Sequence, residues 1–181
     1  GLDVWRPADT QETAAAWREA ILSQERPIAF ALSRQTLQEI PKTKRQISNI
    51  SRGGYVVYGD SSDPDAIIIA TGSEVSISVS AAEQLKIKGV NIRVISMPCQ
   101  EVYERQTLAY KNKCIPKNFD NILAIESGIG DSWHKFVGKK GAIISMKSFG
   151  LSGTGRDVMN HFGFSVNNIE KNINKLIKKN R

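Results

Sequence analysis

The chain has 181 residues, 40% of them hydrophobic and 24% charged, which is ordinary for a globular protein and allows one domain with part of another. No apolar run approaches the ~20 residues of a membrane-spanning helix, and residues 1–5 lack the basic and apolar parts of a secretory signal. The net charge of +7 is concentrated at residues 34–52 and 166–181, and neither stretch interleaves its charges with aromatic residues, so we favour a solvated linker and tail over a nucleic-acid surface.

The first 34 residues predict half of an α/β unit. Asp9 and Glu12 have the spacing of a capping box that begins a helix, and Pro27 marks its end. The apolar run at 28–32 is typical of a buried strand. One helix and one strand do not make a complete domain, so we interpret residues 1–34 as the remnant of a larger one. The start at Gly1 rather than Met agrees with a segment of a longer protein.

Residues 35–52 are polar and basic, contain Pro41, and predict a linker that crosses a surface before Gly53-Gly54. A second α/β pattern follows, over residues 53–181. We expect an edge strand at 55–58, further strands at 66–70, 90–97, 122–125 and 141–146, and helices after 74, at 101–111, after 131, at 157–162 and at 166–179. This alternation indicates a three-layer α/β sandwich with a mostly parallel sheet and helices on both faces.

Several motifs, in this order along the chain, resemble the transketolase family. Trp5-Arg6-Pro7-Ala8-Asp9 resembles the segment before the last helix of the family's pyrimidine-binding domain, and Leu32-Ser33-Arg34-Gln35 resembles that domain's closing strand. The matches in the C-terminal domain are Gly53-Gly54-Tyr55-Val56, Thr71-Gly72-Ser73-Glu74, Val94-Ile95-Ser96-Met97-Pro98, Glu126-Ser127-Gly128-Ile129, Trp133-His134-Lys135-Phe136-Val137-Gly138, Phe149-Gly150 and Phe162-Gly163-Phe164. The resemblance assigns residues 1–34 to the end of the pyrimidine-binding domain, 35–52 to a linker and 53–181 to the C-terminal domain.

The resemblance also implies a function for a parent enzyme. Such an enzyme transfers a two-carbon ketol unit between sugar phosphates in the pentose phosphate pathway, with thiamine diphosphate and Mg²⁺ or Ca²⁺, as a cytoplasmic homodimer. Two alternatives stay open. A non-catalytic α/β module could hold an acidic partner through the basic linker and tail, or the chain could belong to another thiamine diphosphate enzyme.

Arg34 is the main candidate for a binding residue. It follows the predicted strand at 28–32, so it lies at the carboxyl end, where open α/β sheets bind ligands. A guanidinium is permanently charged and can hold a phosphate through two parallel hydrogen bonds. From the residues alone, a solvated linker arginine is the simpler interpretation. In the resembled family the matching arginine holds the substrate phosphate, which implies that role for Arg34, with Ser33 assisting through its hydroxyl.

The chain lacks the family's cofactor motifs. Gly59-Asp60-Ser61 departs from the GDG motif that, with a later NN pair, holds the diphosphate and its metal, and Asn167-Asn168 is too distant to serve. The resemblance puts the activating glutamate and the sugar-handling histidines upstream of Gly1. We therefore expect no catalytic residue, no cofactor or metal bound by the chain alone, no activity of its own, and dependence on the remainder of the transketolase chain.

Other polar motifs receive ordinary structural interpretations. We expect Thr71 or Ser73 to cap a helix, with Glu74 complementing its dipole, and the glycine-rich segment 150–155 to form a turn before a helix. We expect packing or surface roles for the remaining candidates Glu126, His134 and His161. We expect Cys99 and Cys114 to be reduced thiols.

Overall fold

The computed structural model describes residues 1–59 and 62–180. Asp60 and Ser61, from the Gly59-Asp60-Ser61 motif, and Arg181, from the basic tail, lie outside the described residues. Over this part of the chain, none of the helices combines the length and the apolar character needed to cross a membrane.

A five-stranded sheet in the order β3-β5-β4-β6-β7 forms the centre of the main domain. Strands β4, β5, β6 and β7 are parallel, while β3 pairs with β5 in the antiparallel direction at one edge. This confirms the mostly parallel sheet and the edge strand. The strands are β3 (Tyr55–Tyr58), β4 (Ala66–Ala70), β5 (Ile92–Ser96), β6 (Ile122–Ile129) and β7 (Ala142–Met146).

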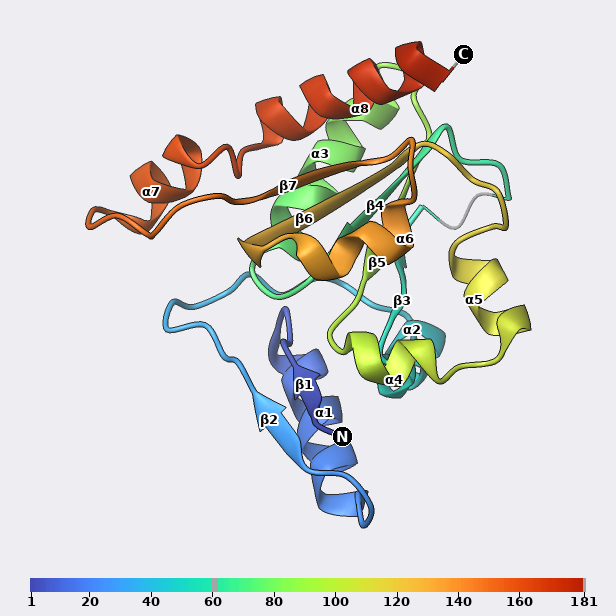
Figure 1. Ribbon diagram of the computed structural model, residues 1–181, viewed down its shortest axis with the longest axis vertical. Coiled ribbons are helices and arrows are strands. Elements are labelled where there is room, and N and C mark those ends of the chain that lie inside the picture. The colour runs from blue at the N-terminus through green and yellow to red at the C-terminus, as the bar shows by residue number, and fades with distance from the viewer. Residues whose placement is uncertain (60–61, 181) are drawn as a thin grey trace.

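Helices cover both faces of the sheet, as predicted (Figure 1). Because strand side chains alternate between faces, Ile68 of β4 packs with the helices of one face, and Ile67 and Ile69 pack with those of the other. The first face is covered by α3 (Glu74–Ile87) and α8 (Val166–Asn180). The second is covered by α4 (Gln100–Glu104), α5 (Leu108–Cys114), the 3₁₀ turn η2 (Asp131–Trp133) and α6 (His134–Val137). A further helix, α7 (Gly155–His161), precedes α8.

The expected single helix at 101–111 is wrong in its extent. The chain forms two short helices, α4 and α5, separated at residues 105–107. The separation has a local cause, because the Thr107 side chain accepts a hydrogen bond from the backbone N–H of Tyr110 and so begins α5 anew.

The N-terminal residues form a small unit of their own. Strand β1 (Asp3–Trp5) pairs in parallel with β2 (Ile28–Phe30), and α1 (Thr10–Leu22) connects them. The sequence pattern predicts α1 but not β1, and it predicts a buried strand at 28–32. The observed strand ends at Phe30 and is only half-buried, because it pairs with β1 alone.

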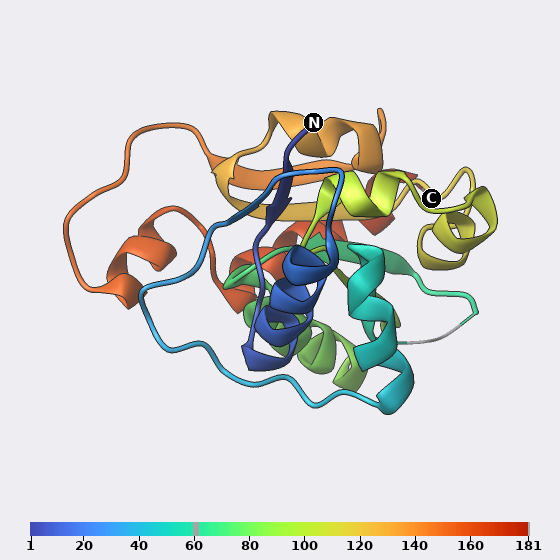
Figure 2. The ribbon, with the colours of Figure 1, turned by 90° about the horizontal axis from the view of Figure 1, so that it is seen from below.

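The predicted linker contains regular structure at its second half. Residues 44–49 form α2 (Lys44–Asn49), followed by the 3₁₀ turn η1 (Ile50–Arg52). A capping box between Thr43 and Gln46 begins α2. Seen from below in Figure 2, α1 and α2 lie side by side. The segment from 35 to 43 connects the N-terminal unit to α2 and the main sheet.

Candidate functional site

The N-terminal unit docks on the carboxyl edge of the parallel strands. The backbone N–H of Arg6 donates to Pro98 O, just beyond β5, at 2.7 Å. The Arg6 carbonyl accepts hydrogen bonds from Gly72 N at 3.1 Å and Thr71 Oγ1 at 3.3 Å, just beyond β4. The carboxyl edge is where open α/β sheets usually bind ligands, and here Arg6 occupies part of it.

A buried acid reinforces this docking. The Glu12 side chain accepts hydrogen bonds from the Tyr55 hydroxyl at 2.8 Å, the Ser96 hydroxyl at 2.6 Å and Ala8 N at 2.8 Å. Burial raises the pKa of the Glu12 carboxyl, and these three hydrogen bonds oppose the increase. Glu12 therefore joins α1 to strands β3 and β5 through a single side chain.

Both predicted binding residues, Ser33 and Arg34, line one cavity of about 320 Å³. Its walls come from the segment that follows β2, from Arg6, from the turn before α3 and from Ser127. Arg34 is exposed and forms no ion pair within residues 1–59 and 62–180. The Ser33 hydroxyl accepts a hydrogen bond from Gln35 N at 3.2 Å, so Ser33 is already partly engaged by its own turn.

Arg6 forms a second wall of the cavity, in a fixed position. Its two terminal nitrogens bond to the two carboxylate oxygens of Glu126, one of them at 2.6 Å from Nη2 to Oε1. Burial alone would lower the pKa of Arg6, but the hydrogen bonds and charge of Glu126 raise it above its ordinary value. The Glu126 carboxylate also accepts from Trp133 Nε1 at 2.9 Å and Gly128 N at 2.6 Å. Glu126 is thus a positioning group for Arg6, a role that its strand-end place in the sequence does not reveal.

Glu74 lines the same cavity and is fully buried. Burial raises the pKa of the Glu74 carboxyl, while the Ser73 hydroxyl and the charge of Arg6 oppose the increase. Its Oε2 atom has no hydrogen-bond partner among the described residues. The capping interpretation of this turn is wrong for both hydroxyls, because Ser73 makes no side-chain cap and Thr71 bonds to Arg6.

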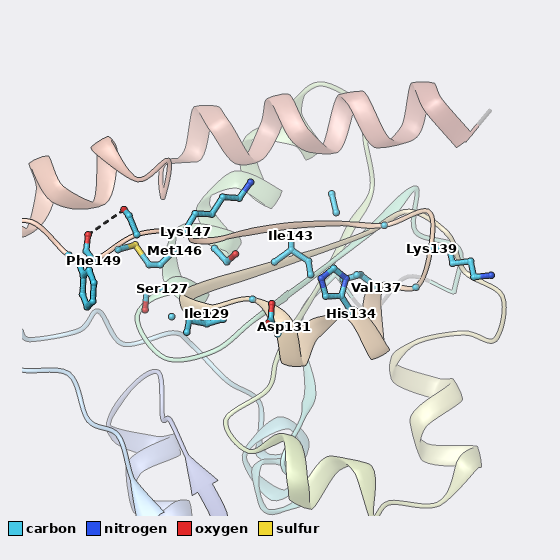
Figure 3. Close-up of a pocket in the computed structure, with 18 residues that line it drawn as sticks. Ser127, Ile129, Asp131, His134, Val137, Lys139, Ile143, Met146, Lys147 and Phe149 are labelled. Carbon is cyan, nitrogen blue, oxygen red and sulfur yellow. Dashed lines mark hydrogen bonds between the residues drawn. The ribbon is translucent and has the colours of Figure 1, made fainter.

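A larger cavity, of about 1060 Å³, lies elsewhere, along β6, α6 and β7. Figure 3 shows its labelled side chains spread along these elements, from Phe149 at one end to Lys139 at the other. Asp131 and His134 both line it, but no hydrogen bond or ion pair joins them in the described structure. Among the described residues that line this cavity, no acid and base are therefore paired.

None of the remaining sequence candidates lines the Arg34 cavity, although Gly155 lies close to the Gln35 side chain, which does line it. His134 begins α6 and His161 ends α7. Segment 150–155 leads into α7, whose first turn is capped by the Thr154 side chain. Cys99 and Cys114 are buried free thiols, and burial raises the pKa of Cys99 to about 12. Within the described part of the chain, no three His, Cys, Asp or Glu side chains are grouped to hold a metal ion.

Comparison with known proteins adds a family context. A family model described as the transketolase-like TK C-terminal domain matches residues 53–165. A transketolase from Buchnera aphidicola is 44% identical over 168 residues, which is 93% of this chain and 25% of the relative. Transketolase 1 of Escherichia coli strain K12 is 41% identical over 176 residues, 97% of this chain and 26% of the relative. The chain thus spans about a quarter of the length of these relatives.

The solved structures agree with this match. A transketolase from Pichia stipitis, in complex with sedoheptulose 7-phosphate, superposes with a TM-score of 0.90 at 32% identity. The superposition covers 98% of this chain and 25% of that one. A transketolase from Leishmania mexicana, also 32% identical, superposes with a TM-score of 0.87. The likeness extends over the N-terminal unit as well as the main domain.

Proposed function

The chain belongs to the transketolase family, and from this premise we propose that it acts as the C-terminal part of a longer enzyme. That enzyme would transfer a two-carbon ketol unit between sugar phosphates in the pentose phosphate pathway, as a cytoplasmic homodimer. Residues 1–34 would complete the pyrimidine-binding domain, 35–52 would link the domains and 53–181 would form the C-terminal domain. The exposed apolar side chains of α1 support this division, because Trp17 is 52% exposed and Ile21 78% exposed, as expected of a helix that packs in a larger domain.

The observation that carries the proposal is the exposed guanidinium of Arg34 in the 320 Å³ cavity, which forms no ion pair with any of the described residues. Arg34 would hold the phosphate of a sugar phosphate through two parallel hydrogen bonds, with the Ser33 hydroxyl nearby as a neutral donor. It would orient and bind the substrate without transferring a proton. Arg6 already forms two side-chain hydrogen bonds with Glu126, so we propose that it shapes the wall of the cavity and does not bind the phosphate.

The residues described here do not fit the family's cofactor. No three His, Cys, Asp or Glu side chains among the described residues are grouped to hold a metal ion. Two cations, Arg6 and Arg34, are among the described residues that line the Arg34 cavity, and of these two only Arg34 has no acidic partner in the described structure. Thiamine diphosphate and its Mg²⁺ or Ca²⁺ would therefore be held by other parts of the longer enzyme. We assign no catalytic step to this chain and expect it to be inactive alone.

A chimeric enzyme tests the role of Arg34. In the chimera, this chain replaces the matching C-terminal segment of the E. coli transketolase, to which it is 41% identical. We expect Arg34→Gln to raise KM for ribose 5-phosphate by roughly tenfold or more, since a charge-assisted hydrogen bond contributes about 1.5–3 kcal/mol. The kcat value and the reaction with unphosphorylated ribose should change little.

Arg18→Gln is the matched control for this test. It removes the same charge from an exposed side chain on α1 that does not line the Arg34 cavity. An Arg34→Gln enzyme that loses activity equally toward ribose and ribose 5-phosphate would contradict the assigned phosphate contact.

A further inference from the structure

A cavity of about 380 Å³ lies between α2, η1, β3 and α5 and shares no lining residue with the Arg34 cavity. We call it the basic cavity, because Arg45, Arg52 and Lys113 all line it. These side chains come from three different elements and are exposed at the cavity. None of the described residues that line it is acidic, and none of the three cations forms an ion pair in the described structure.

Arg52 is held in place by an aromatic platform. Its guanidinium carbon lies 4.5 Å from the ring centre of Tyr110. The Tyr110 hydroxyl donates to Gly54 O at 2.8 Å, which fixes the ring relative to β3. A guanidinium stacked on a ring keeps its N–H groups at its edge, so the stacking leaves its donors free for an anion. The platform therefore preorganises a phosphate-binding group before any ligand arrives.

Two amide side chains complete the walls in different ways. The Gln46 amide nitrogen donates to Val56 O at 3.2 Å and Val57 O at 2.8 Å, so this side chain is engaged within the protein. The half-buried Asn49 amide makes no side-chain hydrogen bond among the described residues. Asn49 thus adds a neutral donor to the three cations.

We propose that the basic cavity binds a small polyanion that carries phosphoryl groups. Three like charges around one cavity repel one another, and an anion with several oxygens would relieve that repulsion while accepting hydrogen bonds from each cation. The cavity volume lies at the lower end of the usual range for small-molecule sites, which suits a ligand of about the size of a diphosphate or a short phosphate ester. The proposal is independent of the function assigned to Arg34.

Titration of the ¹⁵N-labelled chain with inorganic pyrophosphate at 150 mM KCl tests the site. Saturable shifts are expected at the backbone amides of Asn49, Gly54 and Lys113. Arg52→Gln and Lys113→Gln should each weaken binding by about tenfold, since each removes a charged hydrogen-bond donor. Arg18→Gln, which removes one charge from an exposed side chain that lines neither cavity, should leave affinity within twofold. Circular dichroism of each variant separates loss of binding from loss of fold.

Parallel titrations with inorganic phosphate and ribose 5-phosphate distinguish a free phosphate from a phosphate ester as the ligand. Binding of either at the same amides supports the site. The proposal is overturned if none of the three probes shifts these amides at millimolar concentration. It is equally overturned if Arg18→Gln and Arg52→Gln weaken pyrophosphate binding to the same extent, because that result indicates non-specific attraction.

Discussion

Arg6 and Glu126 lie 120 positions apart in the chain, and two parallel hydrogen bonds join their side chains. Glu126 is almost fully buried, with 3% of its side chain exposed, whereas Arg6 keeps 30% of its side chain exposed at the cavity wall. This pair connects the N-terminal unit to β6 (Ile122–Ile129), at the residue after which the pairing with β7 shifts in register. It also fixes Arg6 as part of the wall of the cavity that Arg34 lines.

Breaking the Arg6–Glu126 pair should destabilise the chain. Removing one partner of a buried ion pair leaves the other uncompensated, which costs about 3–5 kcal/mol. We expect Arg6→Gln to cost roughly 3 kcal/mol in the free energy of unfolding, because it leaves the buried Glu126 carboxylate without a cation, and Glu126→Gln to cost less, because the Arg6 side chain that remains is partly exposed. Urea unfolding of both single variants and the double variant measures the coupling. The double variant should cost clearly less than the sum, and strict additivity would show that the pair does not act as a unit.

Glu12 should make stability depend on pH. Burial raises the pKa of Glu12 above its ordinary value of 4.5, so the folded chain holds this proton more firmly than the unfolded chain does. The free energy of unfolding contributed by Glu12 should therefore be highest at low pH and fall as pH rises above about 4.5. Glu12→Gln cannot titrate, and its amide can still pair with Tyr55, Ser96 and Ala8 after the hydroxyls rotate.

Urea unfolding at pH 5 and pH 8 checks this prediction. The loss of stability between the two values should be smaller in Glu12→Gln than in the unmodified chain. Some pH dependence should remain, because the pKa of Glu74 is raised by burial in the same direction. An unchanged pH dependence in Glu12→Gln would mean that Glu12 is ionised at both pH values.

Gly53 and Gly89 offer a matched test of close packing. Both have left-handed backbones, with φ of 78° and 79°. A Cβ on Gly53 would lie 2.4 Å from Cys99 O, whereas a Cβ on Gly89 would meet no atom within 4 Å. We expect Gly89→Ala to cost about 1 kcal/mol through backbone strain alone. Gly53→Ala should cost roughly 3 kcal/mol or more, because steric overlap is added.

Thermal and urea unfolding of the two alanine variants measure these costs. Equal losses of stability would mean that the backbone near Cys99 moves away from the new methyl group without cost. That result would contradict the prediction that close packing of Gly53 against α4 adds a steric cost.

The main domain could be predicted because its signals are local. Apolar runs such as 66–70 and 122–125 indicate buried strands by themselves, and the alternation with helices indicates the parallel sheet. Strand β1 has only three residues, and each pairs with a residue of β2 that lies 25 positions later in the chain. No local sequence pattern therefore predicts β1. The break between α4 and α5 had a visible signal in Thr107, a residue type that commonly caps helices.

The residues of the candidate site likewise fall into those that the sequence predicts and those that it does not. The strand-end position of Arg34 and Ser33 follows from the sequence pattern, and the resemblance supplied their proposed role. The partners Arg6 and Glu126, the buried Glu12 and the buried Glu74 depend on contacts across long stretches of chain. Carboxylates usually remain exposed, so the sequence predicts capping roles for Glu12 and Glu74 and a packing or surface role for Glu126, and it predicts no individual role for Arg6.

Ketol transfer from xylulose 5-phosphate to ribose 5-phosphate, with thiamine diphosphate and Mg²⁺, tests the central claim most directly. The assay compares the chain alone, verified by intact mass near 20.0 kDa, with the chimeric enzyme. The predicted result is turnover by the chimera and none by the chain alone, since the chain would supply substrate contacts but no cofactor site. Turnover by the chain alone at that mass would contradict the claim, because this quarter of the family's length would then hold the cofactor and perform the reaction itself.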